Sequence, residues 1–256
     1  MNIKTCVIQK KFVILQKNRN MKQTSLKNNE PSNIKEYIEA HIKEIQNFEQ
    51  RPIDWTIRGK KIVEEAKQYP WFADAVSRIK PQLSRSDVRE YYEKGELYVG
   101  FVATLLWGYA HTNHINNFQK IVATPKEVVE KKLNNMIAEL SVAPADMEDF
   151  FKNMCNGGKN HIPGLGVSFF TKVFYFTSRI HGMGTLILDS KLWNVAKAFR
   201  KSEGSPLTYG LINCKSIDYS RYCVSMNAIC HQHPEIDAGR LEAYLFEHID
   251  EIKKFA

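Results

Sequence analysis

One carboxylate lies within a strongly basic segment of the chain. Residues 152–201 contain eight lysines and arginines and one acid, Asp189, so the segment carries a formal charge of +7. This charge pattern is expected where a protein binds a polyanion and uses the acid for catalysis. An ordinary solvated basic surface would have the same composition, so the charge alone does not decide between the two.

A tight glycine turn precedes the aromatic part of this segment. The sequence reads IPGLG at 162–166 and VSFFTKVFYF at 167–176. Proline ends the preceding element, and the two glycines permit positive φ and close approach of the backbone. The run after the turn is expected to be a helix, whose first N–H groups lack internal acceptors and attract an anion. A plain corner between two helices would have the same sequence features.

The turn therefore predicts contacts to a nucleic-acid backbone that position the ligand without reading its sequence. The residues predicted to make these contacts are Gly164, Gly166, Val167, Ser168, Lys159 and Lys191.

Helical spacing of apolar residues dominates the rest of the chain, and only short runs such as Thr185–Leu188 are expected to be extended. Capping signals support several helix starts, including Ser86 before Asp87 and Asp189 before Ser190. The pattern predicts an all-α, two-lobed helical bundle. The predicted helices are Ile34–Phe48, Thr56–Glu65, Trp71–Ile79, Ser86–Glu93, Leu97–Gly108, Ile115–Val122, Lys126–Leu140, Pro144–Met154, Val167–Ser178, Ser190–Arg200, Ser216–Ile229 and Asp237–Lys254.

The glycine turn, the helix after it and the sequence LILD at 186–189 together resemble the helix-hairpin-helix DNA glycosylase superfamily. The run GVSFFTKVFYF at 166–176 is similar to the bacterial branch that has the 8-oxoguanine DNA glycosylase fold. The resemblance covers about residues 97–250 and is most specific at 161–193. It implies an active site between two lobes, a helix-hairpin-helix at about 144–180, and double-stranded DNA with an altered base as the partner. The loop at 156–160 is a departure, because the family usually runs on more directly there.

Asp189 matches the catalytic aspartate of that family. Breaking the bond between a base and deoxyribose builds positive charge on the sugar, which a nearby carboxylate stabilises. Asp189 could instead only cap the following helix. The two roles are compatible, because a capping carboxylate keeps one oxygen free.

Lys172 is the candidate nucleophile. Family members that also cut the strand use a lysine two residues after the second hairpin glycine, and it forms a Schiff base with the sugar. That position here is Ser168, and Lys172 follows one helical turn later on nearly the same face. Neighbouring aromatic residues would desolvate the amine and lower its pKa. Alternatively, Lys172 pairs with Asp189 or a phosphate, and Asp189 acts with water.

The resemblance also implies a pocket for a flipped base and side chains that fill the gap in the DNA. Stacking surfaces are predicted at Trp107, Phe169 and Phe246, and Asn113 and His114 are predicted gap-filling residues in a polar tip between two apolar helices. Core packing of the aromatic residues and an ordinary polar turn are the alternatives.

The remaining features exclude several other classes of protein. The five cysteines form no Cys-x-x-Cys pair and match neither a zinc finger nor an iron–sulfur cluster, so no metal or other cofactor is expected. No apolar run approaches the length of a membrane span. Residues 1–29 hold seven basic residues and no acid, and we expect 1–30 to be a flexible basic leader ahead of one helical domain, 31–256. A monomeric cytoplasmic protein is expected.

The sequence thus predicts a DNA glycosylase that releases an 8-oxoguanine-like base, and it leaves the AP-lyase step open. One alternative is a glycosylase that removes modified bases of phage DNA in antiviral defence. A second alternative is a helix-hairpin-helix protein that only binds DNA, and a third is a helical protein-interaction domain without DNA affinity.

Overall fold

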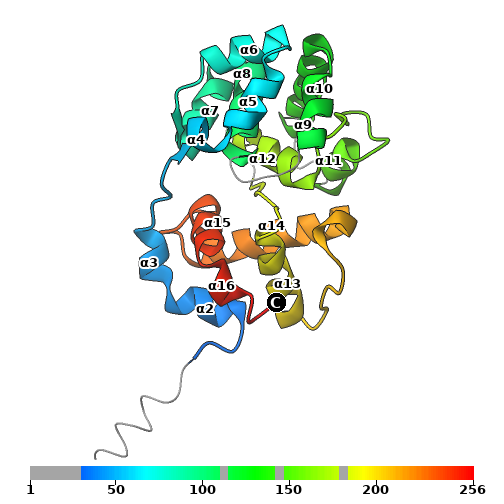
Figure 1. The fold of residues 1–256 in the computed structure, drawn as a ribbon. Helices are drawn as coiled ribbons and strands as arrows, with labels where there is room; N and C mark the ends of the chain where they lie inside the picture. The colour runs from blue at the N-terminus through cyan, green and yellow to red at the C-terminus, as the bar shows by residue number, and fades with distance from the viewer. Residues whose placement is uncertain (1–29, 110–114, 142–146, 179–183) are drawn as a thin grey trace, which may run out of the picture.

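The computed structural model describes residues 30–109, 115–141, 147–178 and 184–256, and its regular secondary structure is almost entirely helical (Figure 1). The predicted leader therefore lies outside the described residues, apart from its last residue. The described elements are α2 Ile34–Ala40, α3 Ile42–Gln46, β1 Ile53–Asp54, α4 Trp55–Arg58, α5 Lys60–Ala66, α6 Pro70–Ser77, β2 Gln82–Leu83, α7 Arg85–Glu93, α8 Leu97–Tyr109, α9 Ile115–Val122, α10 Lys126–Ser141, α11 Met147–Met154, α12 Val167–Ser178, α13 Leu192–Ser202, the 3-10 helix η1 Leu211–Asn213, α14 Ser216–Gln232, α15 Ala238–Glu247 and α16 Ile249–Ile252. The all-α prediction is confirmed; β1 and β2 form a two-residue antiparallel pair.

The helices form two lobes (Figure 1). The middle lobe contains α4 to α12. The terminal lobe combines α2 and α3 with α13 to α16, so the two ends of the folded chain lie in one lobe. Residues 47–52 join the lobes at the left of Figure 1, and residues 184–191 lead into α13 of the terminal lobe. An active site at the lobe boundary can therefore draw side chains from both lobes.

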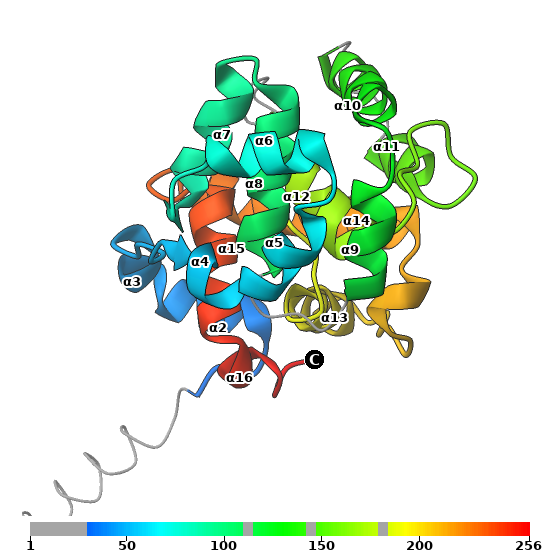
Figure 2. The ribbon, with the colours of Figure 1, turned by 45° about the horizontal axis from the view of Figure 1, so that its top comes forward.

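Helix α12 is the central element. All residues from Phe169 to Ser178 are buried. The helix packs against α7 and α8 (Figure 2). On another side, the ring of Phe174 lies 6.1 Å from the ring of Tyr219 in α14. A helix that is buried all round is apolar on every face except where a polar group has a partner. Lys172 is therefore an exceptional residue in α12.

Three predicted long helices are each divided in two. The breaks are at His41, Gly59 and His248, where ψ lies between 1° and 24°. Apolar periodicity continues across each break because both halves face the same core, so the pattern does not reveal the bend.

The predicted cap of α7 was wrong by two residues. Ser84, and not Ser86, is the N-cap: its side chain accepts from the backbone N–H of Asp87, whose carboxylate accepts from the N–H of Ser84. This reciprocal capping box fixes the start of the helix.

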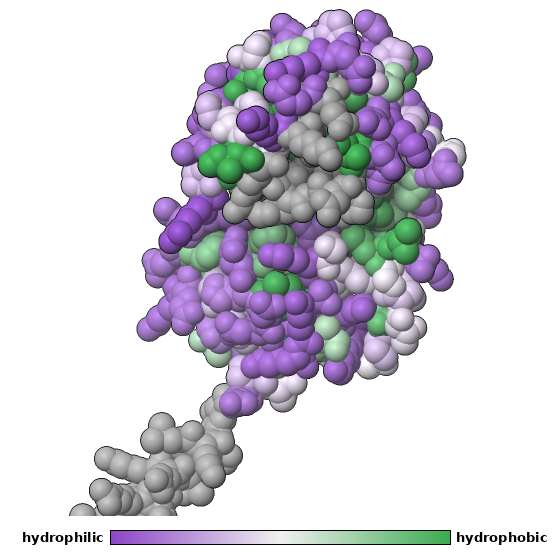
Figure 3. Space-filling model, viewed as in Figure 1, coloured by the Kyte–Doolittle hydropathy of each residue, from purple (hydrophilic) through white to green (hydrophobic). Residues whose placement is uncertain are grey.

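On the face shown in Figure 3, hydrophilic residues predominate over both lobes and hydrophobic residues occur in small separate groups. Within the described ranges, no helix is long and apolar enough to cross a membrane.

Candidate active site

The hairpin consists of α11, a loop and α12, as the resemblance implied. Gly164 in the loop has φ of +84°. A Cβ there would lie 2.2 Å from the carbonyl oxygen of Asn117 in α9, so only glycine fits. Gly166 differs, because its φ is not positive and a Cβ would meet no atom within 4 Å. The sequence had suggested one role for both glycines. In the structure, Gly164 serves packing, and Gly166 leaves the backbone open to solvent.

The start of α12 presents free backbone donors beside Gly166. Phe169 and Phe170 donate to the carbonyl of Gly166 at 2.9 and 3.0 Å. Val167 and Ser168 precede them at the first two helical positions, where a backbone N–H has no acceptor within its own helix. These groups are the ones predicted to bind a phosphate.

The two lysines predicted beside the turn have different neighbours. Lys159 forms an ion pair with Glu139 at 3.0 Å, and its side chain is 60% exposed. Lys191 is exposed, with its Nζ 4.1 Å from the ring centroid of Phe246. Lys191 follows Asp189 by two residues, whereas Lys159 lies on the hairpin loop next to α10.

Lys172 is buried inside α12, with its side chain only 7% exposed. Its Nζ donates to the carbonyl of Ser168 at 2.8 Å and lies 3.5 Å from Oδ2 of Asp189. It is also 5.5 Å from the ring centroid of Phe169. Burial lowers the pKa of the Lys172 ammonium, against the opposing effect of the Asp189 charge. A lowered pKa makes the neutral, nucleophilic amine more available near neutral pH.

Gly108 allows this arrangement. A Cβ at Gly108 would lie 2.8 Å from the ring of Phe169 and 3.1 Å from Cδ of Lys172. The end of α8 can therefore approach the lysine stem closely, which keeps water away from it.

Asp189 divides its two oxygens between structure and the lysine. Oδ1 accepts from the backbone N–H groups of Lys191 and Leu192, both at 3.0 Å, which caps α13. Oδ2 faces Lys172, and the side chain remains 18% exposed. The carboxylate is thus oriented by its own helix and still accessible to a ligand.

The segment before Asp189 is extended and held by side chains of three helices. Leu188 N–H donates to Thr171 Oγ1 at 3.0 Å, and the Tyr219 hydroxyl donates to the carbonyl of Leu186 at 2.8 Å. Between them, Ile187 N–H donates to Glu242 Oε2 at 2.7 Å. These bonds replace sheet pairing for a buried strand-like segment.

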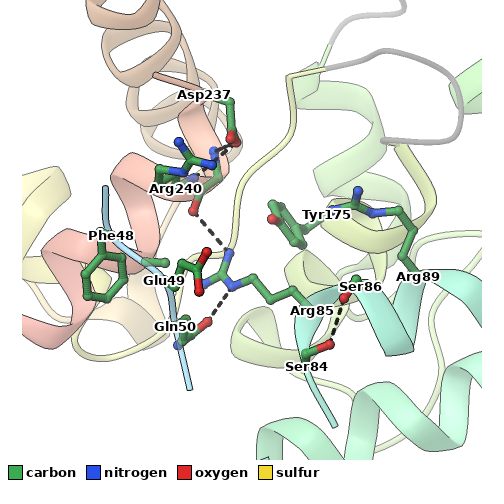
Figure 4. Close-up of a pocket in the computed structure, with 12 residues that line it drawn as sticks. Phe48, Glu49, Gln50, Ser84, Arg85, Ser86, Arg89, Tyr175, Asp237 and Arg240 are labelled. Carbon is green, nitrogen blue, oxygen red and sulfur yellow. Dashed lines mark hydrogen bonds between the residues drawn. The ribbon is translucent and has the colours of Figure 1, made fainter. Parts of the chain in front are cut away.

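A pocket of about 370 Å³ opens between the lobes next to α12. Arg85 extends across it toward Gln50 and the start of α15, with Tyr175 on the other side (Figure 4). The pocket is lined by Phe48, Glu49, Gln50, Ser84, Arg85, Ser86, Arg89, Tyr175, Asp237, Gly239, Arg240 and Ala243.

The aromatic residues predicted to hold a base lie elsewhere. Phe169 is beside Lys172 and Phe246 beside Lys191. Trp107 is buried, and its ring lies edge-on 5.6 Å from Phe176. None of the three lines the pocket, and the gap-filling candidates Asn113 and His114 lie outside the described residues.

Sequence reasoning missed Arg85, Glu242 and Tyr175 as neighbours of this site. Glu242 is fully buried, and its pKa is raised by burial against the opposing charge of Arg85. An acid inside the apolar run LEAYLFE was the available signal, because a fully buried glutamate requires a partner. Arg85 gave no local signal, since its partners are far away in the sequence.

In the portions of the chain that the structure describes, no three His, Cys, Asp or Glu side chains are grouped as metal ligands. Cys155, Cys214, Cys223 and Cys230 are free thiols.

Comparison with protein families matches residues 47–246 to the family described as "OGG: Putative 8-oxoguanine DNA glycosylase OGG-like protein". Comparisons with curated proteins and with solved structures found no match. The family match spans most of the chain and includes the middle lobe, part of the terminal lobe, the hairpin, Lys172 and Asp189.

Proposed function

The chain belongs to the OGG-like family, and on that premise we propose that it is a DNA glycosylase that releases an 8-oxoguanine-like base flipped out of double-stranded DNA. We propose further that it cuts the strand as an AP lyase. The observation that carries this proposal is the buried Lys172 amine 3.5 Å from the Asp189 carboxylate, at the second helix of the hairpin.

The proposed reaction begins with the neutral amine of Lys172. Its nitrogen forms a bond to C1′ of the sugar as the glycosidic bond breaks, and the base leaves with the electron pair and takes up a proton. Asp189 stabilises the positive charge on the sugar and accepts a proton from the attacking nitrogen. Opening of the sugar ring then converts the adduct to a Schiff base. Water takes a proton from C2′, the electron pair of that C–H bond forms the C2′–C3′ double bond, and the 3′ phosphate leaves with the electron pair of the C3′–O bond.

The DNA backbone is proposed to lie along Gly166 and the first turn of α12. The open space at Gly166 supports this placement, as does the position of Val167 and Ser168 in the first turn, where a backbone N–H has no acceptor within its own helix. Lys191, exposed beside Asp189, adds a cation on the same side.

A borohydride trap tests the proposal. The protein is incubated with a labelled duplex that contains 8-oxoguanine opposite cytosine, with and without borohydride, which reduces a Schiff base to a stable amine. We expect a trapped complex with the native chain and none with Lys172→Gln. Lys197→Gln is the matched control, because that lysine lies on α13 and should not affect trapping.

Base release without trapping would mean that Asp189 acts with water and that the lyase step is absent. Duplex binding without base release, over a panel of altered bases that includes modified cytosines, would reject the enzyme and leave a DNA-binding protein.

A further inference from the structure

Arg85 contacts both lobes and the segment that joins them. It belongs to α7 of the middle lobe and is 12% exposed. Its Nε donates to Gln50 Oε1 in the segment between the lobes, and a terminal nitrogen donates to Glu242 Oε1 on α15 of the terminal lobe, both at 2.7 Å. Its guanidinium carbon also lies 4.9 Å from the ring centroid of Tyr175 and 5.4 Å from that of Trp107.

Glu242 connects this arginine to the segment that carries Asp189. One carboxylate oxygen accepts from Arg85, and the other accepts from the backbone N–H of Ile187 at 2.7 Å. Ile187 precedes Asp189 by two residues. A fully buried carboxylate needs both a counter-charge and hydrogen bonds, and Glu242 obtains them from Arg85 and from the N–H of Ile187.

Both charges also act on Lys172. The charged groups around Lys172 are Asp189, Glu242 and Arg85: the two carboxylates raise the pKa of its ammonium, and Arg85 lowers it. Glu242 and Arg85 therefore act on the amine in opposite directions, and the effect of Glu242 is the larger of the two.

We propose that Arg85 and Glu242 are a positioning pair, which holds the Asp189 segment against Lys172 across the two lobes and places two opposite charges behind that amine. The proposal rests on the proposed function for the catalytic meaning of Lys172 and Asp189. The connection itself, from Arg85 through Glu242 to Ile187, is independent of the substrate.

The first test titrates Lys172 by NMR in protein labelled with ¹³C at the lysine Cε, with the resonance assigned by its loss in Lys172→Arg. Glu242→Gln should move the titration to lower pH, because a negative charge is lost and Arg85 is left uncompensated. Arg85→Gln should move it to higher pH. The double variant should titrate between the two single variants.

The matched control is Arg78→Gln, which breaks an ion pair with Glu96 of the same length, 2.7 Å, in the middle lobe. It should leave the Lys172 titration unchanged. Shifts in the same direction for the two single variants, or no shift, would overturn the proposal, because a merely structural pair would not produce opposite signs.

The second test measures single-turnover base release at saturating DNA. The double variant removes both buried charges together and should therefore fold even if a single variant does not. We expect its rate to fall by on the order of 10²-fold, since misplacing a reacting group by about 1 Å costs that much. Arg85→Lys, which keeps the charge, should restore part of the rate lost in Arg85→Gln.

The two tests separate two kinds of failure. If the native chain releases no base, the proposed function fails, and the titration still decides whether the pair acts on Lys172. If the native chain is active and the double variant retains the native rate, the pair does not position the site and the inference is wrong.

Discussion

At the scale of single residues, Asp189 caps a helix and is also the proposed catalytic carboxylate. Oδ1 is used by two backbone N–H groups, and Oδ2 faces Lys172. Two substitutions separate the roles. Asparagine keeps an oxygen for the cap and loses the charge, whereas alanine loses both.

We expect Asp189→Asn and Asp189→Ala to lose base release alike, by about 10²-fold or more, because both remove the carboxylate that is proposed to stabilise the sugar. Asp189→Ala should in addition unfold more easily than Asp189→Asn by about 1 kcal/mol, the usual contribution of an N-cap. Single-turnover assays and urea denaturation measure the two effects. Near-native base release by Asp189→Asn would show that the carboxylate is not the catalytic group.

At the scale of elements, the two glycines of the hairpin turn differ in backbone conformation and in the space around them. Gly164 has positive φ and no space for a Cβ beside Asn117 of α9, whereas Gly166 has open space around it. Gly164 therefore allows the turn to pack against α9, and Gly166 leaves the backbone exposed next to the start of α12.

Alanine at each position should give opposite results. Gly164→Ala should lower the free energy of unfolding by at least 1–2 kcal/mol, roughly the cost of a left-handed conformation for an L-residue, because the clash with α9 adds to it. Gly166→Ala should keep native stability and weaken binding to undamaged duplex. Urea denaturation and fluorescence anisotropy would measure these effects. Native DNA affinity in Gly166→Ala would contradict the placement of the phosphate at this turn.

At the scale of the whole molecule, two basic segments dominate the charge. Residues 1–29 and 152–201 each carry +7, so the rest of the chain is net acidic. Opposite charges on different regions of one molecule are expected to orient it on a polyanion. The hairpin lies in the second segment.

The leader should strengthen DNA binding without changing the reaction. We expect substitution of its six lysines by glutamine to make log K fall less steeply with log salt, since each lost phosphate contact removes about 0.9 from the slope. The rate of base release at saturating DNA should stay native. A control variant has the same change in charge outside the leader, with glutamine in place of Lys35, Lys43, Lys60, Lys67, Lys80 and Lys94. An unchanged slope in the leader variant would show that the leader does not touch DNA.

Local sequence was sufficient for the helical class and for the bounds of α9 and α12, whereas Lys172 and Asp189 became candidates through the family resemblance. The class and the bounds depend on short-range patterns: apolar periodicity, capping residues, and a glycine turn before a helix. The bends at His41, Gly59 and His248 could not be predicted, because periodicity is the same on both sides of each bend.

The sequence by itself determined that a basic, helical chain carries one lysine in an apolar helix and one acid at the start of another. Only the tertiary structure decided that they lie 3.5 Å apart and that Arg85 and Glu242, 157 positions apart in the chain, form a buried ion pair behind them. The physical reason is burial. A charged group inside the protein requires a partner, but local sequence does not specify which distant residue the fold will bring to it.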